Sequence, residues 1–190
     1  MEITSREIVD GQHGPNRLVI GASGAIGRLQ VSTFERAVEF VLRFEGDYSD
    51  DHHDSGGETR YGISKRAYPN IDIKTLTRQQ AKDIYYRDYF LRCKCNELPA
   101  QLALILFDSA VNQGPTAAIR LLQKSLNVGA DGVIGPITIA AAFRASPSLV
   151  ITEFIARRAY QYALHPEVAR FGLGWFRRLA ACHQLAQEPL

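Results

Sequence analysis

The sequence predicts a mainly α-helical single domain that carries a small β element. Most of the chain has helical periodicity with clear stop signals, as in Ala100–Gln113, which Gly114 and Pro115 end. Strand signals are few, and the best of them is Thr59–Ser64. A length of 190 residues, 46% of them hydrophobic, fits one domain with a sizeable buried core.

Residues 1–30 are expected to form a flexible N-terminal arm or leader, and residues 31–190 the domain itself. Within the arm, Val19–Arg28 reads VIGASGAIGR and resembles the glycine-rich fingerprint of dinucleotide-binding proteins. That fingerprint works only between two strands, with an acidic residue about 20 positions further on. The second strand is missing here, because the chain runs from a helix straight into a polar loop. A nucleotide site is therefore the weaker interpretation.

The first helix of the domain is predicted to run from Phe34 to about Glu45. On a helical wheel, Phe34, Val38 and Val41 form one apolar face, and Glu45 falls in the middle of it. A carboxyl group placed there loses hydration, which raises its pKa and favours the protonated form. A protonated acid near neutral pH is what general acid catalysis needs, as in glycoside cleavage. A solvated glutamate at a helix end is the equally weighted alternative.

The later helices have recognisable start signals. Thr77 and Gln80 form a capping box, and the prolines at 115, 136 and 147 suit the first turn of a helix. Asp131-Gly132 makes a turn, after which Val133 and Ile134 are expected to enter the core. The predicted helices are residues 77–92, 100–113, 115–128, 136–146, 147–164 and 175–186.

A polar loop with the sequence DDHHDSGG follows the first helix, from Asp50 to Gly57. Asp54 can close a tight turn, or it can face Glu45 across a cleft as a second carboxylate or water-orienting group. A metal site is disfavoured, because adjacent residues cannot all converge on one ion and the loop has no helical His-x-x-x-His pair. We expect neither a metal nor a cofactor.

The charge balance and the cysteines argue against several classes of function. Lys and Arg number 22 against 20 Asp and Glu, and this net charge of +2 gives no reason to expect nucleic acid as a partner. Cys93, Cys95 and Cys182 are too few and odd in number for a disulfide framework, and indicate thiols made in a reducing compartment. The N-terminus lacks the pattern of a secretory signal. We expect synthesis in the cytoplasm and export by another route.

The loop and its flanks resemble the signature region of glycoside hydrolase family 108, the lysozyme-like N-acetylmuramidases of the prophage endolysin or secretion activator type. Further similarity covers residues 107–126, residues 131–141 and the Gly-Trp-x-x-Arg of residues 174–178, so that the match spans about residues 31–182. Asp47 replaces a glycine of the family pattern, and Asp is among the better substitutes in a turn. The matching loop residues are Glu45, Gly46, Tyr48, Asp51, Asp54, Gly56, Gly57, Thr59, Gly62 and Ile63.

The resemblance implies a lysozyme-like fold and hydrolysis of the β-1,4 bond between N-acetylmuramic acid and N-acetylglucosamine in peptidoglycan. It implies Glu45 as the general acid. A similar spacing in phage-type lysozymes gives Asp54 and Thr59 their candidate roles in orienting the attacking water. Inversion at the anomeric carbon is expected, because only one carboxylate is buried by pattern.

The candidate substrate contacts are Tyr48, Tyr61 and Asn112, and each has a structural alternative. The tyrosines flank the loop, but in a chain with eight tyrosines packing in the core is the default interpretation. Asp108 and Asn112 share one face of the buried helix, where they are expected to hydrogen-bond the loop backbone unless Asn112 touches a sugar N-acetyl group. The only tryptophan, Trp175, is expected to pack in the C-terminal helix pair.

Residues 115–190 resemble the family's peptidoglycan-binding C-terminal segment, although DGVIGPIT, residues 131–138, can simply connect two helices. The expected partners are peptidoglycan and a holin or other export partner. The protein is expected to be a monomer that acts on the cell wall, in the periplasm of a Gram-negative host. The rival hypothesis is a non-catalytic peptidoglycan-binding or secretion-accessory protein, which the presence of Glu45 disfavours.

Overall fold

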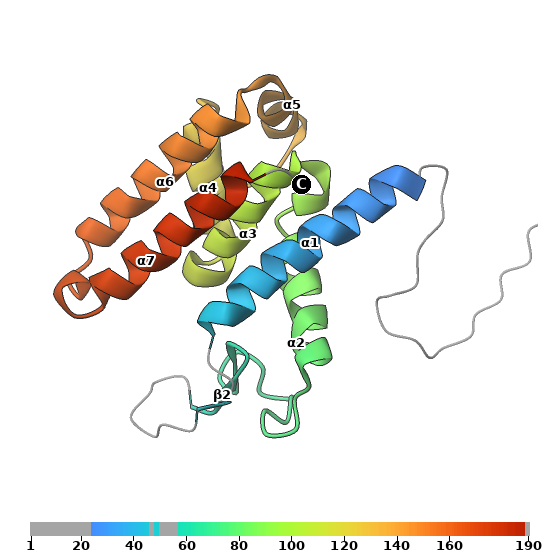
Figure 1. Cartoon of the computed structure of the whole chain (residues 1–190), viewed down its shortest axis with the longest axis vertical. Helices are drawn as coiled ribbons and strands as arrows, with labels where there is room; N and C mark the ends of the chain where they lie inside the picture. Colours follow the sequence, from blue (N-terminus) through green and yellow to red (C-terminus); the bar gives the residue numbers. More distant parts are fainter. Residues whose placement is uncertain (1–23, 46–47, 50–56, 189–190) are drawn as a thin grey trace, which may run out of the picture.

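The computed structural model describes residues 24–45, 48–49 and 57–188. In this part of the chain, a central helix is surrounded by other helices, and a small sheet lies at the end of the first one (Figure 1). The prediction of a mainly α-helical domain with a small β element is confirmed. The α-helices are α1 (Gly24–Phe44), α2 (Arg78–Tyr85), α3 (Ala100–Gln113), α4 (Pro115–Ser125), α5 (Pro136–Arg144), α6 (Pro147–Ala163) and α7 (Val168–Gln187).

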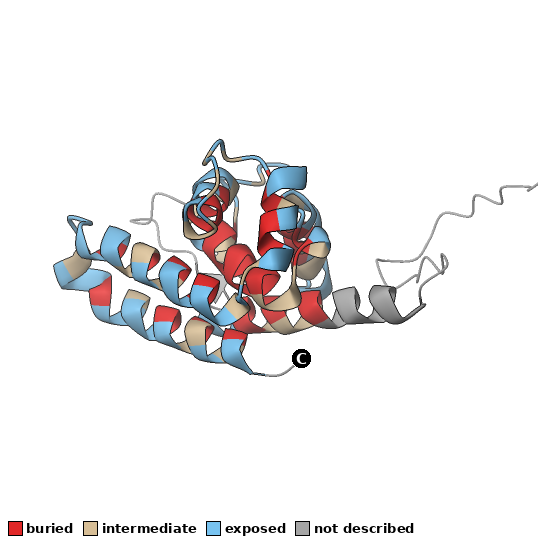
Figure 2. Ribbon diagram, turned by 90° about the horizontal axis from the view of Figure 1, so that it is seen from above, coloured by how far each residue is buried: buried red, intermediate tan, exposed pale blue. Residues whose placement is uncertain are grey.

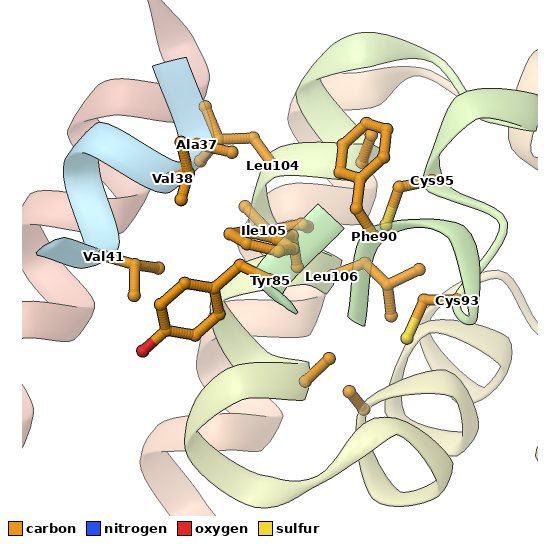
Figure 3. Packing of buried hydrophobic residues seen from close by; sticks show 14 of the residues in the cluster. Ala37, Val38, Val41, Tyr85, Phe90, Cys93, Cys95, Leu104, Ile105 and Leu106 are labelled. Atoms are coloured by element: carbon orange, nitrogen blue, oxygen red, sulfur yellow. The ribbon is translucent and has the colours of Figure 1, made fainter. Parts of the chain in front are cut away.

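Helix α3 forms the centre of the core. Its apolar run from Leu102 to Phe107 is buried, and the helix packs against α1, α4, α6 and α7. Figure 3 shows side chains from α1, α2 and α3, among them Val41, Tyr85 and Ile105, drawn together in this core. Figure 2 shows the contrast with α6 and α7, which pair with each other and are exposed along much of their length.

Helix α1 carries the apolar face predicted for it. Phe34, Val38 and Val41 are 7%, 0% and 0% exposed. The Phe34 ring lies 5.2 Å from that of Phe90 and 5.9 Å from that of Phe107, which anchors α1 to its two neighbouring elements. The helix begins at Gly24 rather than Phe34, so it takes in residues 24–30 of the predicted arm.

The capping box predicted at Thr77 and Gln80 is present and starts α2. This helix continues into a π-helical stretch, η1 (Tyr86–Leu91), and a short 3-10 helix, η2 (Cys95–Glu97), follows. Helix α2 and η1 together account for the predicted helix over residues 77–92.

The β element is a three-stranded antiparallel sheet with the order β1-β2-β3. The strands are β1 (Tyr48–Ser49), β2 (Thr59–Arg60) and β3 (Ile63–Ser64). The predicted strand over Thr59–Ser64 is thus a hairpin, because the chain turns at Tyr61 and Gly62. Both turn residues have positive φ, 52° and 76°, as in the turns that join two-residue hairpins.

The connector between α4 and α5 is held by the buried side chain of Gln123. Its amide nitrogen donates to Asp131 Oδ1 (2.6 Å) and its amide oxygen accepts from the Gly132 amide (2.8 Å). Ile134 enters the core as expected, but Val133 is 64% exposed and does not. These contacts give residues 131–138 a structural role in joining two helices.

Candidate active site

Glu45 lies directly after α1, at the end of its buried face. Its amide donates to the Val41 carbonyl (3.2 Å), so the helix sets the position of the residue. The side chain is 25% exposed, whereas Val38 and Val41 on the same face are fully buried. The apolar face therefore ends in a half-buried carboxyl group at the boundary of the core.

Arg178, on α7, is the charged neighbour of Glu45. Its Nη1 donates to Glu45 Oε1 (3.0 Å), and its Nε donates to Asp108 Oδ1 (2.9 Å). Burial disfavours the charged guanidinium, but the two carboxylates outweigh that effect and raise the pKa of Arg178. The setting predicted for Glu45 was apolar, and the structure instead places a cation beside it.

Asp108, on α3, is 1% exposed and lies between two arginines. One oxygen accepts from Arg178 and the other from Arg158, which is itself fully buried on α6. Burial alone would raise the pKa of Asp108, but the two guanidiniums lower it, so the buried group is ionised. Asp108 has the structural role expected of it, although its partners are arginines and not the loop backbone.

The turn of the β hairpin lies against Glu45. A Cβ atom at Gly62 would be 2.9 Å from both Cγ and Oε2 of Glu45, and it would also collide with the Tyr85 hydroxyl. That hydroxyl donates to the Tyr61 carbonyl (2.9 Å) and so pins the turn to α2. Gly62 is therefore required both for its φ of 76° and for the space that it leaves beside the carboxyl group.

Burial and the nearby Glu45 raise the pKa of Tyr85, whose side chain is almost completely buried. The hydroxyl therefore keeps its proton at neutral pH and remains a donor to the Tyr61 carbonyl. Glu45 is thus enclosed by α1, the hairpin turn and α7.

The candidate site residues in the loop and the small sheet are placed differently by the structure. Asp54 lies outside the described residues. Tyr48 is on β1 and pairs with Arg60, but its side chain is likewise not described. Thr59 is half-buried on β2, and its hydroxyl donates to the Gly57 carbonyl (3.3 Å). Tyr61 is half-buried and is the only one of these whose own turn is shown to pack on Glu45.

Asn112 belongs to a second group of side chains, at the α6–α7 end of the molecule. It is exposed, and its Oδ1 accepts from the Tyr162 hydroxyl (2.7 Å). The Tyr162 ring lies 5.4 Å from that of Trp175, which confirms the expected packing of Trp175 in the C-terminal helix pair. Within the described residues, Asn112 contacts Tyr162, whereas Glu45 contacts Arg178.

The sequence alone did not assign roles to Arg178, Arg158 or Gly62. Arg178 is the arginine of the Gly-Trp-x-x-Arg motif, which has no role assigned from the sequence, and its neighbour Arg177 is exposed. Helical spacing is the signal that could have separated them, since Arg178 falls on the same face as the buried Cys182, four residues on. The partner of Arg178 could not be found this way, because Glu45 is 133 positions away.

Other kinds of site have no support within the described ranges. The described residues include no group of three or more His, Cys, Asp or Glu that could hold a metal ion, and Asp50–Asp54 lie outside them. Cys93, Cys95 and Cys182 are buried free thiols, as expected, and burial raises the pKa of Cys93 to about 12. None of the described helices alone is long and apolar enough to cross a membrane, although α5 and α6 pass that test as a bent pair.

The chain is similar to a known protein family and to a solved structure. The sequence model of the family described as Glycosyl hydrolase 108 matches residues 38–114, a range that contains Glu45, Gly62 and Asp108. The structure of Brucella abortus SagA is similar to this chain, with a TM-score of 0.74 and 32% sequence identity, over 82% of this chain and 94% of that one. The lysozyme-like fold expected from the sequence is thereby confirmed. No curated protein matches the chain.

Proposed function

Because the chain belongs to the glycosyl hydrolase 108 family, we propose that it is an N-acetylmuramidase that hydrolyses the β-1,4 bond between N-acetylmuramic acid and N-acetylglucosamine in peptidoglycan. The observation that carries this proposal is the placement of Glu45. Helix α1, the hairpin turn and α7 all lie against its carboxyl group, which is neither fully buried nor fully exposed. A general acid has to combine a fixed position with access to the substrate.

In the proposed reaction, Glu45 gives a proton to the glycosidic oxygen as the bond to the anomeric carbon breaks. A water molecule attacks the anomeric carbon and loses a proton, so that hydrolysis is complete and the acid is restored by proton exchange with solvent. The family match and the position of Glu45 support this role.

Asp108 is not proposed as the second catalytic group. Asp108 is adjacent to Glu45 through Arg178, but it is buried and both of its oxygens accept hydrogen bonds from arginines. It is therefore not available to activate water or to attack a sugar. Asp54 and Thr59 remain the proposed water-orienting residues, and the Thr59 hydroxyl oxygen can still accept a hydrogen bond while it donates to Gly57.

Tyr48, Tyr61 and Asn112 are the proposed sugar contacts. The exposed position of Asn112, with its amide oriented by Tyr162, suits a hydrogen bond to an N-acetyl group. The half-buried ring of Tyr61 carries the Arg60 guanidinium 5.3 Å from its centre and lies in the turn next to Glu45. Aromatic rings of this kind present apolar surface and a polar end to a sugar.

The protein is proposed to act on the cell wall, which in a Gram-negative host lies in the periplasm. It is proposed to be a monomer that leaves the cytoplasm with the help of a holin or other export partner. A non-catalytic peptidoglycan-binding or secretion-accessory protein is the rival function. The two differ in one measurable property, the appearance of new reducing ends in peptidoglycan.

The test is digestion of purified sacculi, and of outer-membrane-stripped cells, followed by borohydride reduction and mass spectrometry of the fragments. N-acetylmuramitol at the new ends, together with falling turbidity, is the expected result. N-acetylglucosaminitol would mean that the other glycosidic bond is cut. Binding to sacculi without new ends would support the rival function. The Glu45→Gln protein is the matched control.

A further inference from the structure

We propose that Arg178 is a positioning residue for the catalytic acid: it holds Oε1 of Glu45 and so makes Oε2 the oxygen that carries and delivers the proton. This inference rests on the proposed function. It concerns which atom of Glu45 reacts and which part of the fold fixes that atom.

The first argument is the chemistry of the guanidinium group. Arginine has five N–H donors, has no acceptor, and stays protonated in proteins. Its Nη1 donates to Glu45 Oε1 at 3.0 Å. A proton on Oε1 would therefore face another donor, so the neutral acid has to carry its proton on Oε2.

The second argument is the space around Oε2. The missing side chain of Gly62 leaves this oxygen room, because a Cβ there would lie 2.9 Å from it. Among the described residues, Oε1 accepts a hydrogen bond from Arg178 and none donates to Oε2. The two oxygens of one carboxyl group thus have different environments, one held by a cation and the other left beside a bare backbone.

The third argument is the rigidity of Arg178 itself. Its side chain is 10% exposed, its Nε is bonded to Asp108, and its guanidinium lies 5.4 Å from the centre of the Phe44 ring. Asp108 is held in turn by the fully buried Arg158. Asp108 is thus a fixed, buried anchor for Arg178, and of the two arginines only Arg178 contacts Glu45.

The same contact serves the acid after it has reacted. When Oε2–H protonates the glycosidic oxygen, the electrons of the breaking C–O bond go to that oxygen and Glu45 becomes a carboxylate. The new negative charge forms beside Arg178, whose positive charge stabilises it. Arg178 touches neither the substrate nor the reacting atoms in this proposal, so it acts only through Glu45.

Arg158 offers a matched control, because both arginines bond to Asp108 and only Arg178 bonds to Glu45. We would measure kcat and KM on a defined soluble peptidoglycan oligomer for Arg178→Gln and Arg158→Gln, with thermal unfolding of each. The expected result for Arg178→Gln is a loss of about 10- to 100-fold in kcat with little change in KM. Arg158→Gln should be destabilised as well, yet lose much less kcat. Equal losses of kcat in the two variants would show that Arg178 acts only through the buried ion pair and would overturn the proposal.

Arg178→Lys covers the case in which Arg178→Gln does not fold. Lysine keeps the charge, but one ammonium group does not reproduce the two-nitrogen contact with Asp108 and Glu45. We expect a folded protein with kcat between those of the wild type and Arg178→Gln, or below the wild type if the latter is unfolded. A kcat equal to that of the wild type would contradict the need for this geometry.

Crystal structures of the variants give a readout that does not depend on activity. The Glu45 carboxyl group should leave its place against Gly62, or occupy several orientations, in Arg178→Gln or Arg178→Lys and stay in place in Arg158→Gln. An unmoved carboxyl group in the Arg178 variants would overturn the proposal. If the wild type releases no reducing ends, or if Glu45→Gln is fully active, the proposed function fails instead, and the crystal structures still decide whether Arg178 positions Glu45.

Discussion

Asp108 and Glu45 are two carboxyl groups that share one arginine, and they differ in how completely they are enclosed. Asp108 is 1% exposed and accepts hydrogen bonds on both oxygens. The Glu45 side chain is 25% exposed and has the Arg178 contact on one oxygen. The full burial of Asp108 suits a structural anchor. The partial burial of Glu45 leaves its second carboxyl oxygen available for chemistry.

The physical reason for the difference is the cost of burying charge. A buried ion is tolerated only when its partners satisfy it, as the two guanidiniums do for Asp108. A carboxyl group at the edge of the core keeps water on one side and needs fewer partners. Changes at the two positions should therefore separate stability from activity.

The largest effect is expected for Asp108→Asn, which keeps the shape of the side chain and removes its charge. Two buried arginines then lose the anion between them, and the loss of one partner of a buried pair costs about 3–5 kcal/mol. Urea unfolding followed by circular dichroism measures this change in the free energy of unfolding.

The pH dependence of stability checks the same cause. The folded-state pKa of Asp108 lies below its ordinary value of 3.8, so its stabilisation is present above that value and is lost as the pH falls through the lower folded pKa. The variant should therefore lose less stability than the wild type between neutral pH and the acid range. If the free energy of unfolding fell by the same amount with pH in both proteins, Asp108 would not be the cause of the acid sensitivity.

Glu45→Gln is expected to show the opposite pattern. Glutamine can still accept from Arg178 but cannot donate a catalytic proton, so the proposed muramidase activity should fall by about 100-fold or more. The free energy of unfolding should change far less than in Asp108→Asn. Reducing-end release and urea unfolding on the same preparation test both halves, and a folded Glu45→Gln protein with near-normal activity would reject the assignment of the acid.

Gly62→Ala should disturb Glu45 from the other side. Alanine at a φ of 76° costs about 1–2 kcal/mol, and its Cβ would also press on Oε2. Gly57→Ala is the matched control, because Gly57 has a φ of 68° and a Cβ there would meet nothing within 4 Å. Both variants should lose stability from backbone strain, and Gly62→Ala should lose more because its Cβ also meets the Tyr85 hydroxyl, while kcat should fall clearly only in Gly62→Ala. Similar kcat values would mean that the turn does not position the acid.

Asp54→Asn is expected to have the smallest effect, a loss of activity below that of Glu45→Gln. A residue that orients water contributes less than the proton donor, and the expected stereochemical outcome is inversion. Proton NMR of the first product from a defined peptidoglycan oligomer distinguishes the anomers. Initial appearance of the β-anomer would mean retention and would make Asp54 a nucleophile or merely part of its own turn.

The sequence was sufficient for features that depend on neighbours along the chain. The apolar face ending in Glu45, the capping box at Thr77 and the end of α3 at Gly114 all follow from helical spacing and local hydrogen bonding. Family resemblance in the loop then drew attention to Glu45, although an isolated helix gave no reason to prefer a catalytic role over a solvated one. The start of α1 at Gly24 differs from the predicted start at Phe34, because its first residues lie in the glycine-rich segment assigned to the arm.

Only the tertiary structure decided what surrounds Glu45. The partner Arg178 is 133 positions away, and the two buried arginines on α6 and α7 meet Asp108 from 50 and 70 positions away. Periodicity assigns a residue to a face of its own helix but does not say which residue of another helix it will meet. The packing of α7 on α3 and the hairpin turn beside α1 bring these groups together, and this juxtaposition distinguishes the two oxygens of Glu45.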